Sequence, residues 1–242
     1  MNFRKRWARP FRDIAMIAAG LAALSFLPPD TSLSEREAVG SLRFCVPSLN
    51  SALLRDPQTG EPAHELQLMQ SVADGLGLTL RVVENGNMGR SFNPADWHIS
   101  RGQCDVLGGG LADTPTNRGF LTLLPTGERI GLVLTVNEEP PTGSEVGVFM
   151  GSAGLDRVKL SAWMRGKGWR AKPIRDAGEL STWIAAGKPA IASTLNEFPA
   201  GTVQNLLPDE ASTVSDLAFG LWRGDMTLTR AVREQLTKHR NK

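Results

Sequence analysis

The sequence predicts an α/β protein of two lobes, each a mostly parallel sheet flanked by helices. Short β-rich apolar runs alternate with amphipathic segments along the chain, which is the pattern of parallel strands with crossover helices. A segment rich in proline and glutamate, residues 137–144, divides this pattern into two series. In each series a loop of small residues follows a strand, at residues 108–110 and 151–154. Open α/β sheets bind ligands at such strand ends.

The first series begins with residues 42–46, which alternate in polarity and are rich in β-formers. Residues 64–76 carry apolar side chains at helical spacing, and Gly77 follows as a stop signal. Thr114 is a predicted N-cap because a proline follows it. The predicted strands are 42–46, 78–83, 104–107 and 130–136, and the predicted helices are 64–76, 95–101 and 115–122.

The second series repeats this alternation after the linker. Its predicted strands are 145–150, 170–174, 190–193, a brief one at 205–207, and 217–222, and its predicted helices are 155–166, 177–186 and 226–238. We therefore expect a first lobe of residues 39–136, completed by 217–242, and a second lobe of 137–216.

The N-terminus, residues 1–38, is expected to be a signal peptide or membrane anchor followed by a polar spacer. A basic stretch precedes an apolar run at residues 14–27, which is shorter than the ~20 residues of a membrane span. The best cleavage site, at residues 23–25, is weak because the apolar run continues past it. We expect an exported, periplasmic protein that touches the membrane only through this segment.

The composition excludes several functional classes. The net charge of the 242 residues is only +2, which argues against nucleic acid as the main partner. The motifs GxSxG and HExxH and a complete P-loop are absent, and the three histidines are scattered. We therefore expect no enzyme, no catalytic residue, no metal site and no cofactor.

The chain contains two cysteines, Cys45 and Cys104. An isolated pair in an exported protein favours a disulfide. Two buried free thiols are the alternative.

Residues 102–118 read as one unit of strand, glycine loop and helix start, with a cation at Arg118. Backbone N–H groups beside a helix start and an arginine suit a carboxylate or another small anion. The alternative is an ordinary strand-to-helix turn with a surface arginine.

Several segments resemble the family of bacterial extracellular solute-binding proteins for polar amino acids and related solutes. The likeness runs from about Leu42 to the C-terminus and is carried by residues 42–47, 59–61 with 72–78, 101–106, 110–118, 146–152 and 219–225. It implies a type II periplasmic-binding fold with a cleft between the lobes. It also implies a small ligand and an ABC permease as partners.

The resemblance also implies roles for individual residues. In the family, the loop arginine binds the carboxylate of the ligand, so the resemblance makes Arg118 the residue that binds the ligand carboxylate. Thr114, Gly110 and Asp113 of the same loop would be further ligand contacts. Ser152 would complete the site from the second lobe, and Thr194 lies near where the family has an aspartate for the ligand amine. One more residue separates Thr114 from Arg118 than is usual in the family.

A sub-group offers a second function. The first strand and the cysteine before Asp105 also resemble solute-binding-like proteins encoded with periplasmic quinoprotein alcohol dehydrogenases. That resemblance implies an accessory partner of such a dehydrogenase, or a sensor, in place of a transport receptor. It also strengthens the expectation of a Cys45–Cys104 disulfide.

Overall fold

The computed structural model describes residues 13–18, 29–47, 53–55, 59–88, 94–149 and 156–240. The chain forms two compact units, Met1–Thr31 and Ser32–Lys242. Most of the predicted export signal lies outside the described residues. Its described part, residues 13–18, is an exposed stretch of helix. Within the described ranges, no helix has the length and apolarity needed to cross a membrane.

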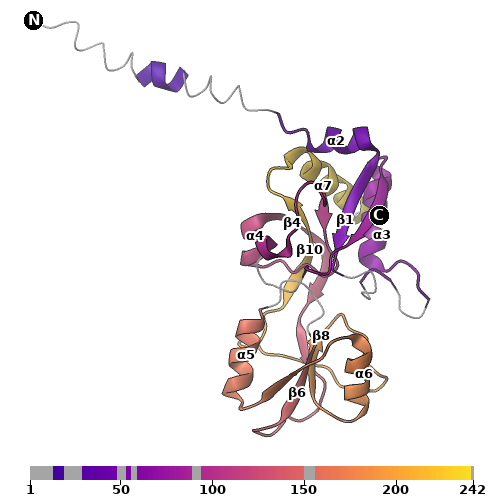
Figure 1. The fold of residues 1–242 in the computed structure, drawn as a ribbon, viewed down its shortest axis with the longest axis vertical. Helices are drawn as coiled ribbons and strands as arrows, with labels where there is room; N and C mark the ends of the chain where they lie inside the picture. Colours follow the sequence, from indigo (N-terminus) through magenta and orange to yellow (C-terminus); the bar gives the residue numbers. More distant parts are fainter. Residues whose placement is uncertain are drawn as a thin grey trace, which may run out of the picture. The chain divides into compact units, whose positions relative to one another are not determined.

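The larger unit contains two mixed five-stranded sheets with helices packed against them (Figure 1). This confirms the predicted two-lobed α/β class. The first sheet has the order β2-β1-β3-β10-β4. Its elements are β1 (Ser41–Val46), β2 (Thr79–Glu84), β3 (Val106–Leu107), β4 (Leu121–Ile130) and β10 (Ser215–Trp222), with helices α2 (Ser32–Val39), α3 (His64–Gly75), α4 (Pro115–Phe120), α7 (Met226–Arg240) and the short 3-10 helix η1 (Pro94–Trp97).

The second sheet has the order β7-β6-β8-β5-β9. Its elements are β5 (Leu132–Leu134), β6 (Glu145–Phe149), β7 (Arg170–Pro173), β8 (Ala190–Ser193) and β9 (Asn205–Leu206), with helices α5 (Arg157–Gly166) and α6 (Ala177–Ala185). Val146 packs in one core with Leu160 of α5, whereas Trp183 of α6 contacts the backbone at Gly147. Because neighbouring residues of a strand face opposite sides, α5 and α6 cover opposite faces of this sheet (Figure 1).

Both sheets contain antiparallel strands at the points where the chain passes between them. In the first sheet β1 runs parallel to β2 and β3, whereas β10 is antiparallel to β3 and β4. In the second, β6 is parallel to β7 and β8, but β5 is antiparallel to β8 and β9. In the first sheet the strand of opposite sense is therefore β10, by which the chain returns, and β4 runs in the same sense as β3.

The crossing into the second lobe differs from the prediction. The expected strand at 130–136 is divided at Gly131, and β5 already belongs to the second sheet. Leu132 and Leu134 are buried in the core cluster that also contains Val146 of β6 and Leu160 of α5. The return strand begins at Ser215, slightly before the expected residue 217.

The helix after Thr114 is shorter than expected. It ends at Phe120, and the ten-residue strand β4 follows at once. Residues 121 and 122, which were predicted to be helical, pair instead with Trp222 and Leu221 of β10. This long antiparallel ladder overrides the local preference for continuing the helix.

The polar spacer predicted before residue 39 is in fact the helix α2. Ser32 is buried, and its hydroxyl lies 3.0 Å from that of Thr227 at the start of α7. The backbone N–H groups of Leu33 and Leu228 donate to these two hydroxyls. Side-chain hydroxyls therefore satisfy backbone N–H groups at the start of both helices, and the folded unit begins near Ser32.

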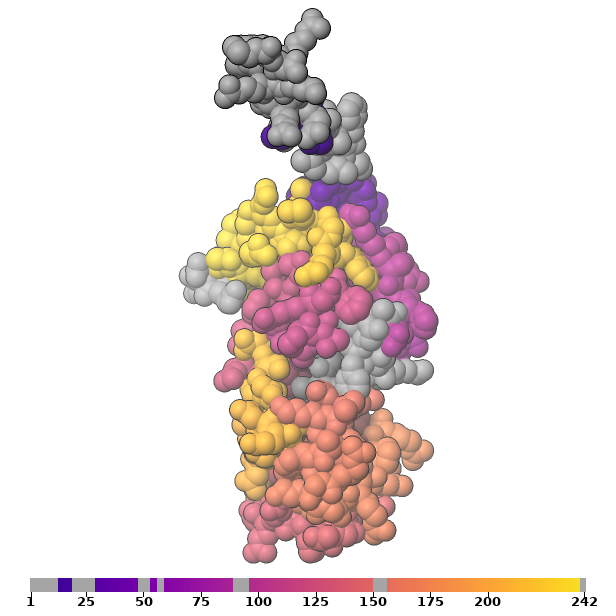
Figure 2. All heavy atoms as spheres, turned by 90° about the vertical axis from the view of Figure 1, so that its left-hand side faces the viewer, coloured from indigo at the N-terminus to yellow at the C-terminus, as the bar shows by residue number. Residues whose placement is uncertain are grey.

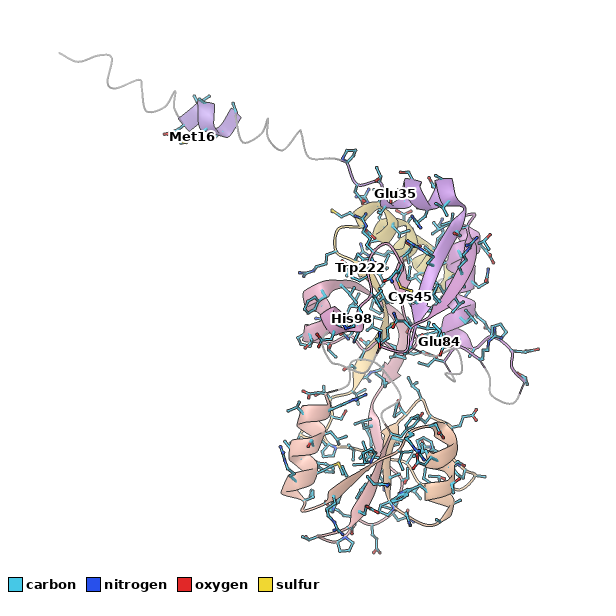
Figure 3. The ribbon with its side chains drawn as sticks, in the orientation of Figure 1. Met16, Glu35, Cys45, Glu84, His98 and Trp222 are labelled. Carbon is cyan, nitrogen blue, oxygen red and sulfur yellow. A yellow bond between two sulfur atoms is a disulfide. The ribbon has the colours of Figure 1, made fainter. Side chains whose placement is uncertain are left out.

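The predicted disulfide between Cys45 and Cys104 is present, with its Cα atoms 5.7 Å apart. Cys45 lies on β1, and Cys104 precedes the adjacent strand β3. Trp222 of β10 packs beside the bridge and donates from Nε1 to the Cys104 carbonyl at 2.7 Å (Figure 3). The bridge therefore fixes the strand that leads into the glycine loop.

Candidate functional site

The start of α4 is fixed by Thr114, as the sequence predicts. Its hydroxyl accepts a hydrogen bond from the Asn117 N–H at 3.2 Å, and its backbone is extended. Asn117 is fully buried and donates from its side chain to the Ala112 carbonyl at 2.8 Å. Asn117, which lies between Thr114 and Arg118, therefore contributes to the packing of the short helix.

Arg118 binds a carboxylate of its own chain. Its Nε and Nη2 donate to Oδ1 and Oδ2 of Asp113 at 2.6 and 2.8 Å. This two-bond arrangement is the one that an arginine offers to the carboxylate of a ligand. The hydrogen bonds to Asp113 raise the pKa of Arg118 above its ordinary value. The guanidinium therefore stays charged, but Asp113 neutralises it.

The glycine loop also binds an internal carboxylate. The N–H groups of Gly109 and Gly110 donate to Glu65 at 2.6 and 3.4 Å. Gly109 has a φ of +77°, and a Cβ there would lie 2.6 Å from the ring of Pro47, so glycine is required. The sequence predicted an anion at this loop, and the anion in the structure is the side chain of Glu65.

Glu65 is completely buried in the first turn of α3. Burial is the main cause that raises its pKa from 4.5 to about 7, and nearby Glu128 adds to the rise. The two loop N–H groups act in the opposite direction because they stabilise the charged form. Glu65 therefore changes its protonation near neutral pH.

A pocket of about 780 Å³ lies between the two lobes, within the size range of small-molecule sites. Figure 2 looks at the face of the molecule that carries α4 and α5. The lining comes from the start of α4, the start of α5, one residue of β4 and the segment leading into β10: Asp113, Thr114, Pro115, Thr116, Arg118, Arg129, Asp156, Val158, Lys159, Ser212, Thr213, Val214, Ser215 and Asp216.

Among the described residues, three acidic and three basic side chains line the pocket. Besides the Arg118–Asp113 pair, Arg129 lies 3.7 Å from Asp216. Lys159 donates to the hydroxyl of Thr213 at 2.9 Å. The charges of the lining are therefore balanced, and each cation already has a polar neighbour.

The predicted site residues divide into three groups. Asp113, Thr114 and Arg118 line this pocket together. Gly110 is buried below it and directs its N–H to Glu65. Thr194 lies at the lobe crossing, where its hydroxyl accepts a hydrogen bond from the Gly131 N–H at 3.2 Å. Ser152 lies outside the described residues.

Sequence reasoning missed three contributions to the pocket. Asp216 accepts the Asp113 N–H through its backbone carbonyl at 2.7 Å, and no local pattern signals such a contact. Arg129 follows from the undetected strand β4. Asp156 caps α5 by accepting the Lys159 N–H at 2.9 Å. An aspartate before an amphipathic run is a readable cap signal.

Comparison with solved structures identifies the fold. The chain superposes on the ancestral amino-acid-binding protein AncCDT-1, a precursor of cyclohexadienyl dehydratase, with a TM-score of 0.65 at 16% identity, over 87% of this chain and 94% of that one. Arginine-bound, truncated ArgBP from T. maritima gives 0.63 at 15% identity, over 85% and 99%. An L-arginine-bound amino acid ABC transporter substrate-binding protein from Streptococcus pneumoniae gives 0.60 at 15%, over 87% and 92%.

Sequence comparison alone finds less. No family model matches the chain. Among curated proteins, membrane-bound lytic murein transglycosylase F from Shewanella pealeana is 26% identical over 137 residues, which are 53% of this chain and 28% of that protein. The match thus spans little more than a quarter of the relative. The structural likeness, at low identity, establishes the two-lobed type II periplasmic-binding fold.

Proposed function

We propose that this chain, which has the two-lobed fold of amino-acid-binding proteins, is an exported solute receptor for an ABC-type transporter. It would hold a small, amino-acid-like solute with a carboxylate in the pocket between its lobes. The observation that carries the proposal is that Arg118, at the start of α4, lines a pocket to which both lobes contribute. Solved proteins with the same two-lobed fold include ABC transporter components that bind arginine.

Arg118 is the proposed anchor of the solute carboxylate, because a guanidinium can hold a carboxylate by two parallel hydrogen bonds. Thr114 and Asp113 lie beside it in the same pocket. Gly110 is a weaker candidate as a donor because Glu65 already accepts from it. Ser152 and Thr194 stay proposed contacts from the second lobe. In this reading the protein binds and releases its solute unchanged and is no enzyme.

Export and a periplasmic location are part of the proposal. The basic and apolar N-terminal stretch supports them. The Cys45–Cys104 disulfide adds support, because such bonds persist in oxidising compartments.

The experiment is a thermal-shift screen of the exported protein with the common L-amino acids and small carboxylates. A solute that binds the native state raises the unfolding temperature. At a free solute concentration of about 100 times Kd, binding adds about 2.7 kcal/mol to the free energy of unfolding. Arg118→Gln should abolish the shift. Arg129→Gln, which removes the same charge from the same pocket, should keep most of it.

Two results would count against the proposal. An equal shift in wild type and Arg118→Gln would remove Arg118 from the site. No shift with any solute, together with a dehydrogenase that co-purifies with the protein, would favour the accessory role.

A further inference from the structure

Asp113 occupies the Nε–Nη2 edge of Arg118, one of the two edges by which a guanidinium can hold a carboxylate with two hydrogen bonds. Both of its oxygens accept from the guanidinium, at 2.6 and 2.8 Å. A carboxylate that binds Arg118 in the same way must first displace Asp113. The affinity of the pocket for an anion therefore depends on where the Asp113 carboxylate can go.

The Asp113 side chain has little access to water, since only 11% of it is exposed, compared with 65% of Arg118. Its backbone is also held, because its N–H donates to the Asp216 carbonyl at 2.7 Å. Only a side-chain rotation can release Arg118. A partly buried carboxylate that loses its cation carries a desolvation cost without compensation.

The other two cations among the described residues of the lining each have a polar neighbour. Arg129 lies 3.7 Å from Asp216 and Lys159 donates to Thr213. A solute with only negative charge would therefore add a charge to a balanced pocket and leave Asp113 unpaired. A solute that also carries a cation brings its own partner for Asp113.

We propose that Asp113 is a specificity residue of the pocket. It withholds Arg118 from solutes that carry only negative charge. It admits a solute whose carboxylate replaces Asp113 on Arg118 while the solute's cationic group pairs with Asp113. The inference rests on the proposed function in taking the interlobe pocket as the solute site. It assigns selectivity to one side chain and names the solute class as one with both charges.

Calorimetric titration of the exported protein tests this with two probes, succinate and L-arginine. Asp113→Asn keeps the size of the side chain and removes its charge. We expect it to bind succinate at least about tenfold more tightly than wild type and L-arginine at least about tenfold more weakly, because one charged hydrogen-bonding contact is worth that much.

The matched control is Glu179→Gln. It removes the same charge from another arginine pair, Arg175–Glu179 at the start of α6, which does not line the pocket. Its affinities should equal those of wild type, and this excludes an effect of net charge. Asp113→Ala serves as a second variant, and circular dichroism of each variant checks that it is folded.

The outcomes separate this inference from the proposed function. If wild type binds succinate as tightly as Asp113→Asn does, or binds an amino acid that the variant binds equally well, the specificity role is wrong and the solute receptor stands. If Asp113→Asn gains succinate but wild type binds no solute of the screen, Asp113 does withhold Arg118 from anions, but the admission of a solute with both charges and the receptor function are wrong. If neither protein binds any probe, both are wrong.

Discussion

Two internal carboxylates hold the two halves of the anion site that the sequence predicted, and they differ in burial. Glu65 accepts from the glycine loop and is completely buried. Asp113 accepts from Arg118, whose side chain is 65% exposed. Both contacts have the chemistry of ligand recognition. A ligand can replace Asp113 on the exposed Arg118 without opening the core, whereas it cannot replace the buried Glu65 in this way.

Burial decides between the two roles because water competes differently for them. The Arg118 side chain is 65% exposed, so a carboxylate from solution can reach it and compete with Asp113 for it. The N–H groups of Gly109 and Gly110 point into the protein, and without Glu65 they would lose their acceptor in a dry site. Glu65 is therefore a structural part of the loop, and Asp113 a controlling part of the pocket.

The largest expected effect that separates the two carboxylates is on stability. Glu65→Ala should lower the free energy of unfolding by about 2–5 kcal/mol, because it leaves two buried N–H groups without an acceptor and opens a cavity. Urea unfolding measures this. Glu61→Ala removes an exposed carboxylate just before the same helix and should have little effect. Equal losses in the two variants would show that Glu65 does not support the loop.

A second difference concerns pH. The pKa of Glu65 is raised from 4.5 to about 7 in the folded protein, so the folded state binds more protons than the unfolded state in this window. The stability from this group is fully present below pH 4.5 and is lost as the pH rises through about 7, a change on the order of 3 kcal/mol. Urea midpoints across the window measure it.

Glu65→Gln cannot titrate and should flatten this part of the pH profile. Between pH 4.5 and about 7, the urea midpoint of Glu65→Gln should change less with pH than that of wild type. Parallel profiles for wild type and Glu65→Gln would mean that another group titrates in this window.

The smallest expected effect is that of Asp113→Ala on stability. Arg118 is mostly exposed, and ion pairs of exposed side chains contribute little to stability. The urea midpoint should stay within the scatter of ordinary surface substitutions, whereas the solute affinities change. A loss of stability as large as that of Glu65→Ala would show that Asp113 is a structural residue, and the two carboxylates would then not differ in role.

The parts of the fold that depend on nearby residues were predictable from the sequence. The Thr114 cap, the helix from His64 and most strand positions follow from local patterns. The disulfide followed from the number of cysteines and the compartment. These features need few distant contacts, so the sequence alone was sufficient.

The features that the sequence could not predict depend on distant partners. The strand β4 replaces the helix because Leu121 pairs with Trp222, about a hundred residues away in the sequence. Glu65 lies 44 residues from the loop that it binds. Asp113 is only five residues from Arg118, but it precedes the helix, so helical spacing gives no sign of the pair. No pattern in the sequence therefore indicated that Glu65 and Asp113 accept hydrogen bonds from the glycine loop and from Arg118.

The Cys45–Cys104 disulfide closes a segment that contains α3, β2 and Glu65. A protease that cuts the backbone at one point between the two cysteines would therefore leave a single covalent molecule. Such a nicked protein would migrate as one band in a non-reducing gel and as two after reduction. A mass measurement under non-reducing conditions would therefore overlook such a cleavage. Reduction of the disulfide would remove the covalent link between the two pieces.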